Sequence, residues 1–409
     1  MDILEIGASR GQKVDFMTLV KEPYKKKCAR YVEKCGGPYQ IFVPEKDKTP
    51  MDYFEEAFRP LKKYKDKIDV IIDGSTTRGF MQPSQASLYA QQAGLKPTQY
   101  FDMSQACNGF CLALEQAYMM FECNKELEDK YILIINNEQP PEGRALEPND
   151  VNDYKQVSSY FVGLTFSSVC TCTILKRSSN YSWEFIKYSN PKYASHISIG
   201  LPQIAEGYLP KCEKYDVYLN DQYGQFCIPR LHQVHEKINF ILKTYFARKD
   251  FFKKCHLITH TFTNTVYDKC LYYEKMEKLS LYYSNAGNLA SCSLPYILWM
   301  EYGEKIKDGQ NILFFGNAAG GADCNLLFTH NKKYDIKQGQ GILKQRKQLQ
   351  GNKYINAFKY GVMVAIKKII CPSRRYPVTT EPLEIELNDQ DNQNIEKKDT
   401  KKCKKQKQQ

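Results

Sequence analysis

The stretch Asp102-Met-Ser-Gln-Ala-Cys107-Asn-Gly-Phe-Cys-Leu-Ala-Leu114 is the most informative part of the chain. An extended segment, residues 99–103, leads to a cysteine, and an apolar pattern typical of a helix follows at once. That pattern has the spacing i, i+3, i+4, i+7 and consists of Phe110, Ala113, Leu114 and Ala117. We therefore expect Cys107 in a strand-to-helix turn, at or beside the first turn of a buried helix.

This position would suit a nucleophile. The helix dipole favours a thiolate at its N-terminus, and free backbone N–H groups there can hold a developing oxyanion. Gly109 would let the backbone approach a ligand closely. A buried core cysteine explains the segment equally well, because free cysteine is among the most buried residue types.

Three later segments favour the nucleophile. Residues 256–264 predict a short apolar strand that ends in His260. Residues 283–295 predict a turn at Gly287 and Asn288, followed by a second helix rich in small residues. Residues 311–321 predict a strand and then a glycine-rich turn. Cysteine, histidine and asparagine thus each stand at a strand end or a helix start.

In this order and context the segments resemble the condensing enzymes of the thiolase superfamily, and most closely 3-oxoacyl-acyl-carrier-protein synthase III. That family has the patterns Asp-x-x-x-Ala-Cys-x-Gly-Phe and Gly-Asn-x-x-x-x-Ser-x-Pro, which match residues 102–110 and 287–295. The resemblance extends from the first strand to about residue 327, roughly four-fifths of the chain.

The resemblance implies a mechanism. Cys107 would take the acyl group of an acyl-thioester, and His260 and Asn288 would bind a malonyl-thioester and stabilise the enolate formed when carbon dioxide leaves. The oxyanion would rest against the Cys107 N–H and a backbone N–H of the turn near Gly316. The implied partners are acyl-coenzyme A and either an acyl carrier protein or malonyl-coenzyme A. No metal and no redox cofactor is implied.

The resemblance also implies the fold, a five-layer α-β-α-β-α sandwich of two pseudo-duplicated halves. We expect the nucleophile half in residues 1–177, the half with histidine and asparagine in residues 178–327, and an extension in residues 328–409. Residues 354–370 could form an amphipathic helix that packs on the core. The lysine-rich end after Glu396 should be a disordered, solvated tail.

Composition is compatible with such an enzyme. The chain has 409 residues, a formal net charge of +12 and 15 cysteines without a C-x-x-C pair, so neither a zinc site nor a redox dithiol is indicated. Many unpaired thiols suit a reducing compartment, and we expect a cytoplasmic protein, with an organelle left open. No apolar stretch is long enough for a membrane span, and nucleic acid is not expected as a partner. A basic surface would help an acidic carrier protein or a coenzyme A phosphate to dock.

Several positions depart from the family. The glycines of a Phe-Gly-Asp-Gly-Ala turn are replaced in residues 166–170, and Thr263 stands where relatives have asparagine. An arginine that contacts coenzyme A in relatives would fall near Tyr160. In relatives the loop before a helix proline shapes the acyl tunnel across a dimer. Here that loop holds Phe80 and Gln82, and the polar Gln82 predicts a preference for short or polar acyl groups.

Two function classes remain open. The chain is either an active condensing acyltransferase or a catalytically inactive structural or binding subunit of the same fold. A thiolase proper would need a second cysteine near the glycine-rich turn, where Cys324 is a poor candidate. A homodimer is expected in either class, with the edge strand in residues 98–103 pairing between subunits.

Overall fold

The structure is a computed structural model that consists of two compact units, residues 1–342 and residues 343–409. The described residues all belong to the first unit, and they are 1–20, 22, 24–79, 82–140, 161, 163–188, 197–199, 217–219, 255–264, 278–280, 282–307, 310–318 and 323–331. The expected helix in residues 354–370 and the basic tail lie outside them.

Five strands form the first sheet, in the order β1-β7-β6-β4-β5. They are β1 (Asp2–Arg10), β4 (Ile68–Asp73), β5 (Gln99–Asp102), β6 (Tyr131–Glu138) and β7 (Val169–Lys176). β4 is parallel to β5 and β6, whereas β7 is antiparallel to both β6 and β1. β5 is an edge strand, as predicted.

The second sheet repeats this topology, in the order β12-β11-β13-β14-β8. Its strands are β8 (Tyr181–Tyr188), β11 (His256–Thr259), β12 (Lys278–Ser280), β13 (Ile312–Ala318) and β14 (Asp323–Asn331). β11 is parallel to β12 and β13, and β14 is antiparallel to β13 and β8. Chain order and strand directions match those of the first sheet, so the predicted pseudo-duplication is present in the topology.

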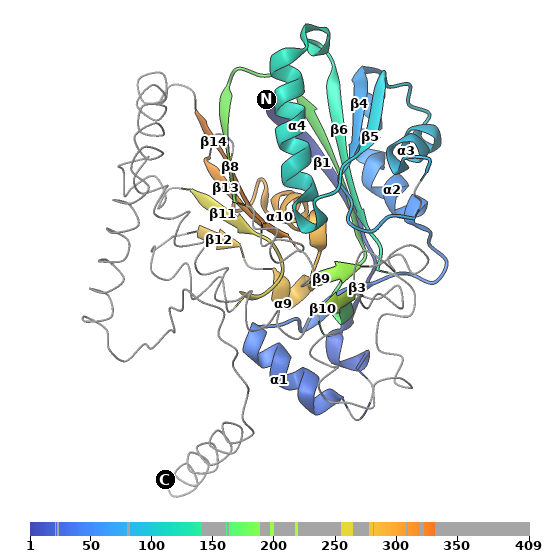
Figure 1. Cartoon of the computed structure of the whole chain (residues 1–409), viewed down its shortest axis with the longest axis vertical. Helices are drawn as coiled ribbons and strands as arrows, with labels where there is room; N and C mark the ends of the chain where they lie inside the picture. Colours follow the sequence, from blue (N-terminus) through green and yellow to red (C-terminus); the bar gives the residue numbers. More distant parts are fainter. Residues whose placement is uncertain are drawn as a thin grey trace, which may run out of the picture. The chain divides into compact units, whose positions relative to one another are not determined.

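Helices cover both faces of the first sheet (Figure 1). On the outer face, α2 (Pro50–Phe58) and α3 (Gln85–Ala93) pack against residues such as Ile71. On the inner face, α4 (Gly109–Cys123) and α10 (Ser293–Glu301) pack between the two sheets, against Val70 and Ile72. Alternate residues of β4 therefore face opposite helical layers, which explains its almost continuous apolar sequence. The outer helices expected beyond the second sheet lie outside the described residues.

Smaller elements complete the described part. They are α1 (Lys25–Cys35), α9 (Tyr283–Ala286), the pair β2 (Gln12–Asp15) and β3 (Gln40–Val43), and the pair β9 (Ile197–Ile199) and β10 (Val217–Leu219). Short 3-10 helices are η1 (Phe16–Thr18), η2 (Arg59–Lys67), η3 (Ala106–Asn108), η4 (Lys125–Leu127) and η7 (Ala290–Cys292).

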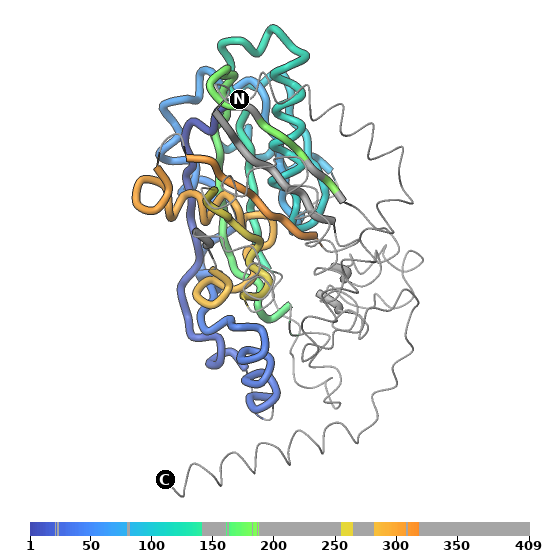
Figure 2. Tube along the Cα trace, turned by 90° about the vertical axis from the view of Figure 1, so that its left-hand side faces the viewer, coloured from blue at the N-terminus to red at the C-terminus, as the bar shows by residue number. Residues whose placement is uncertain are grey.

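The N-terminus lies beside the connection between the two sheets (Figures 1 and 2). The Met1 ammonium donates to the carbonyl of Ser178 at 2.8 Å, and Trp183 Nε1 donates to the Met1 carbonyl at 2.7 Å. The first and second sheets are thus tied together at the start of β1 and β8. Among the described residues, no helix combines the length and the apolar character that a membrane crossing requires.

Candidate active site

Cys107 lies in the turn between the first sheet and α4. β5 ends at Asp102, η3 contains Cys107, and α4 begins at Gly109. The predicted strand-to-helix turn is therefore confirmed, and the Cys107 side chain is buried, with 9 % of its surface exposed. Ala106, the residue before it, has a φ of 45°, which is uncommon outside glycine and costs backbone energy. The turn is a strained elbow that holds the thiol at the N-terminal end of α4.

The close approach at Gly109 differs from the expectation. A Cβ atom on Gly109 would lie 1.8 Å from the carbonyl oxygen of Gly74, which directly follows β4. The glycine therefore serves a contact between two backbone segments rather than between backbone and ligand. It seats the start of α4 against the end of β4.

Asn288 is buried and its side chain has a fixed orientation. Its Oδ1 accepts a hydrogen bond from the Ala290 N–H at 2.9 Å, so Oδ1 is identified by its donor and Nδ2 points the other way. Its own N–H donates to the Thr165 carbonyl at 2.7 Å, and its carbonyl accepts from the Ser167 N–H at 2.9 Å. Ser167 belongs to the stretch that replaces the family's glycines, and in this chain it anchors the asparagine.

His260 follows β11 directly, as predicted, and it is 4 % exposed. Its N–H donates to the Phe315 carbonyl at 2.9 Å, which places it beside β13. Burial lowers the pKa of His260 to about 4, and the neighbouring Asn288 side chain acts in the opposite direction. The imidazole is therefore neutral at pH 7. Neither ring nitrogen makes a hydrogen bond to the described residues.

Thr261 joins the histidine segment to the asparagine segment. Its hydroxyl accepts from the Leu289 N–H at 2.8 Å and lies 2.8 Å from the Ser293 hydroxyl. Because Thr261 follows His260 and Leu289 follows Asn288, these bonds hold the two candidate residues side by side. The turn with Cys107 packs against η7 and against β13, so the elements that carry all three candidate residues meet between the sheets.

Gly316 lies within β13 and not in a turn after it, because the strand continues to Ala318. The prediction that Gly316 belongs to a turn was therefore wrong. A Cβ atom on Gly316 would lie 2.3 Å from Asn108 Oδ1 and 3.2 Å from Cys111 Sγ. The glycine lets β13 approach the turn that carries Cys107. The later glycines of the predicted turn, Gly320 and Gly321, lie outside the described residues.

The predicted tunnel residues are described only in part. Gln82 is exposed and precedes Pro83 in a cis peptide bond. Phe80 lies outside the described residues, so the tunnel stays a prediction. Thr263, the substitute for a family asparagine, turns its hydroxyl to the Cys35 carbonyl at 2.9 Å.

The sequence did not indicate Glu138, a fully buried carboxylate at the end of β6. Its Oε1 accepts from the Thr76 N–H at 2.7 Å and from the hydroxyl and N–H of Ser291. Its Oε2 accepts from the N–H and the hydroxyl of Thr77, both at 3.1 Å. Glu138 therefore connects the loop after β4 with η7, three residues beyond Asn288. N–H and O–H donors thus satisfy both oxygens of the buried Glu138 side chain.

Ser291 occupies in the second half the place of Cys107 in the first. It lies in η7, directly before α10, and the preceding Ala290 has a φ of 46°. The two strained elbows, at Ala106 and Ala290, therefore match in conformation and in position before an inner helix.

Among the described residues, no three histidine, cysteine, aspartate or glutamate side chains cluster as a metal site would require. The described cysteines form no disulfide. Cys28, Cys170, Cys172 and Cys255 are buried, and Cys35 is partly buried.

No protein-family model matches the sequence, and no curated protein matches it. Solved structures of OleA from Xanthomonas campestris do match in fold. A cysteine-to-serine variant with bound lauric acid and lauroyl-coenzyme A has a TM-score of 0.64 at 14 % identity, over 80 % of this chain and 98 % of that chain. A histidine-to-aspartate variant has a TM-score of 0.66 at 16 % identity, over 80 % and 97 %. A cerulenin-bound form has a TM-score of 0.64 at 15 % identity, over 80 % and 96 %. The chain therefore has the thiolase-like α/β fold of OleA over about 80 % of its length.

Proposed function

We propose that the protein is a condensing acyltransferase of the 3-oxoacyl-acyl-carrier-protein synthase III type. Cys107 attacks an acyl-thioester, the carrier leaves as its thiol, and a new thioester forms on Cys107. A malonyl-thioester then loses carbon dioxide, and its enolate carbon attacks the acyl carbonyl. The Cys107 thiolate leaves, and the product is a 3-oxoacyl-thioester.

The observation that carries the proposal is the pairing of a neutral, buried His260 with an oriented Asn288. Stabilising an enolate oxygen requires N–H donors already in place. His260 is uncharged because burial lowers its pKa to about 4, and its ring nitrogens have no partner among the described residues. With Asn288 Oδ1 held by Ala290, Nδ2 is the second donor. The Cys107 N–H and a backbone N–H near Gly316 would receive the oxyanion of the condensation step.

An acyl-coenzyme A is the proposed acyl donor. The support is the OleA variant that binds lauroyl-coenzyme A, a protein with the same fold. The extender is a malonyl group on an acyl carrier protein or on coenzyme A. We also propose a homodimer through the open edge of β5, where Tyr100 is 51 % exposed. The loop with Phe80 and Gln82 would then reach the partner's acyl tunnel.

A product assay tests the proposal. The protein is incubated with an acyl-coenzyme A and malonyl-coenzyme A, or malonyl-acyl carrier protein, and the released carbon dioxide and the 3-oxoacyl-thioester are quantified. We expect both products in equal amounts from the wild type. Cys123→Ala, which alters an exposed cysteine at the end of α4, should keep this activity, and Cys107→Ala should lose it. No product with either extender would favour the inactive structural or binding subunit.

A further inference from the structure

A cavity of about 240 Å³ lies outside the candidate active site, between the start of α2 and the face of α3. Its apolar walls include Pro50, Met51 and Leu88, and its polar walls include Thr77, Arg78 and Tyr89. None of Cys107, His260 or Asn288 lines it. The cavity is therefore distinct from the three candidate catalytic residues.

Arg78 has a buried edge without hydrogen bonds. Its Nε and Nη2 are shielded from solvent and have no partner among the described residues. These two atoms form the edge of the guanidinium that grips a carboxylate through two parallel hydrogen bonds. Leaving such donors buried and unpaired is costly. Arg78 is also among the residues that line the cavity.

Asp73 interacts electrostatically with Arg78, whose charge lowers the pKa of Asp73, but the two groups form no ion pair in the described part of the chain. Asp73, fully buried at the end of β4, accepts instead from the Ser75 hydroxyl at 2.5 Å and from Gln85 Nε2 at 3.2 Å. Burial raises the pKa of Asp73 to about 7, so its charge is only partial at neutral pH and opposes an incoming anion weakly.

Tyr89 supplies a second donor to the same cavity. Its hydroxyl oxygen accepts from Asn137 Nδ2 at 3.1 Å, and its own O–H has no acceptor in the described part of the chain. Asn137 itself is saturated, because Nδ2 also donates to the Pro50 carbonyl and Oδ1 accepts from Gln139 Nε2. Gln85 Nε2 and Gln139 Nε2 also line the cavity and each uses one of its two N–H groups within the protein. Arg78 and Tyr89 add the charged donor and the hydroxyl donor.

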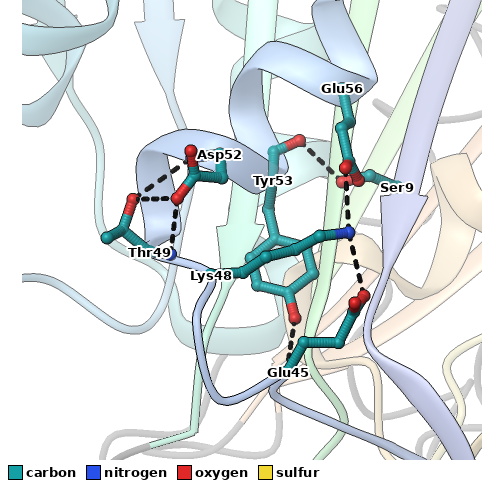
Figure 3. A network of polar contacts seen from close by, with 7 residues as sticks. All are labelled: Ser9, Glu45, Lys48, Thr49, Asp52, Tyr53 and Glu56. Carbon is teal, nitrogen blue, oxygen red and sulfur yellow. Dashed lines mark hydrogen bonds and ion pairs between the residues drawn. The ribbon is translucent and has the colours of Figure 1, made fainter.

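The α2 wall is held in place independently of any ligand (Figure 3). Thr49 and Asp52 form a capping box at the start of α2. Lys48 bridges Glu45 at 2.9 Å and Glu56 at 2.8 Å, and its ammonium lies over the Tyr53 ring. A ligand therefore enters a preformed cavity and does not have to order this wall.

From this combination we propose that the cavity is a second binding site, for a small monocarboxylate with a short apolar chain. The Arg78 guanidinium and the Tyr89 hydroxyl hold the carboxylate, and Met51 and Leu88 contact the chain. A volume of about 240 Å³ is many times the roughly 10–15 Å³ that one water requires, so the cavity can admit a small organic molecule. Hexanoate is a small monocarboxylate with a short apolar chain and serves as the probe. This inference does not depend on the proposed acyltransferase function.

Calorimetric titration of the full chain tests the site with three probes: hexanoate, 1-hexanol as the chain without charge, and inorganic phosphate as charge without a chain. We expect hexanoate to bind at one molecule per chain and the other two to bind at least tenfold more weakly. Arg78→Gln should weaken hexanoate binding by roughly 10- to 100-fold, the effect of losing charge-assisted hydrogen bonds. Tyr89→Phe, which keeps the ring and the packing, should weaken it by roughly 3- to 10-fold.

The matched control is Arg59→Gln, which alters an exposed arginine directly after α2 and should leave hexanoate binding unchanged. Hexanoate binding that survives both Arg78→Gln and Tyr89→Phe would place the ligand elsewhere and overturn the proposal. If 1-hexanol binds as tightly as hexanoate, the carboxylate contact proposed here is wrong. If phosphate binds as tightly as hexanoate, the proposed contact with the apolar chain is wrong. Absence of hexanoate binding to the wild type would overturn the site itself.

Discussion

The hydroxyl of Ser291 donates a hydrogen bond to Oε1 of Glu138, and this contact joins the two halves of the fold. Ser291 lies in the elbow of the second half and Glu138 at the end of a strand of the first sheet. The same carboxylate holds the loop after β4 through Thr76 and Thr77. One buried acid thus fixes the segment of Asn288 relative to the first half.

Glu138→Gln should therefore destabilise the protein and disturb the asparagine. An amide cannot accept at both of its terminal atoms, so at least two of the five donors around Glu138 would face an N–H₂ group. We expect a loss of about 2–4 kcal/mol in the free energy of unfolding, measured by urea titration. The exposed Glu128→Gln, which alters a surface pair with Arg177, is the control and should cost under about 1 kcal/mol. Equal losses in the two variants would contradict the role assigned to Glu138.

Substitution of His260 or Asn288 should affect decarboxylation of the malonyl-thioester but not acylation of Cys107. Without either donor the enolate has lost part of its stabilisation, whereas the thiol of Cys107 is untouched. His260→Ala and Asn288→Ala should therefore block decarboxylation of a malonyl-thioester and still allow acylation of Cys107. Release of carbon dioxide and the mass of the acylated protein measure the two steps separately. Equal loss of both steps would indicate that these residues support only the fold.

The buried imidazole predicts a pH dependence of stability. The folded-state pKa of His260 is about 4, below the ordinary value of 6.5, so the unfolded chain binds this proton first as the pH falls. The contribution of His260 to the free energy of unfolding is fully present above pH 6.5 and is lost progressively as the pH falls toward 4. It amounts to roughly 3 kcal/mol in total. In His260→Gln this contribution disappears, so the free energy of unfolding should fall less between pH 6.5 and pH 4. If the free energy of unfolding falls equally with pH in the variant and the wild type, the ring of His260 is not buried in its uncharged form.

The open edge of β5 predicts a dimer that a single charge can weaken. Lysine on an edge strand opposes pairing with another strand, and Tyr100 is half exposed on this edge. Light scattering at micromolar concentration should give a dimer for the wild type and a larger monomer fraction for Tyr100→Lys. Tyr39→Lys alters a tyrosine of similar exposure outside the sheet and should remain dimeric. A wild type that is monomeric in this measurement would contradict the proposed dimer.

Local sequence patterns were sufficient to predict the elements around the site. The spacing from Phe110 onward predicted α4, and the apolar runs before His260 and after Asn311 predicted β11 and β13. These patterns are short-range, because a buried face of a helix or strand determines the spacing of apolar residues within a few positions. The elbow at Cys107 was found because the extended segment and the helix meet at the cysteine itself.

Contacts between distant residues could not be predicted in this way. Glu138 and Ser291 are 153 positions apart, and nothing in either neighbourhood indicates the other. Gly109 was attributed to a ligand because sequence shows that a close approach is possible but not what approaches, which here is Gly74. The strand β13 extends past Gly316 because pairing with β14 continues through Asn325, Cys324 and Asp323, a partner that the glycine-rich sequence does not reveal.

The most direct test of the central claim is the intact mass of the protein after incubation with acyl-coenzyme A donors from acetyl to lauroyl. We predict one acyl group per chain, located on Cys107 by peptide mapping and absent in Cys107→Ala. That variant should retain its fold, with a loss of about 1–2 kcal/mol in stability, because thiol removal deletes little buried volume. Short-chain donors should acylate faster than long-chain donors if Gln82 ends the tunnel. A folded wild type that acquires no acyl group from any donor, or acquires it equally in Cys107→Ala, would contradict the account.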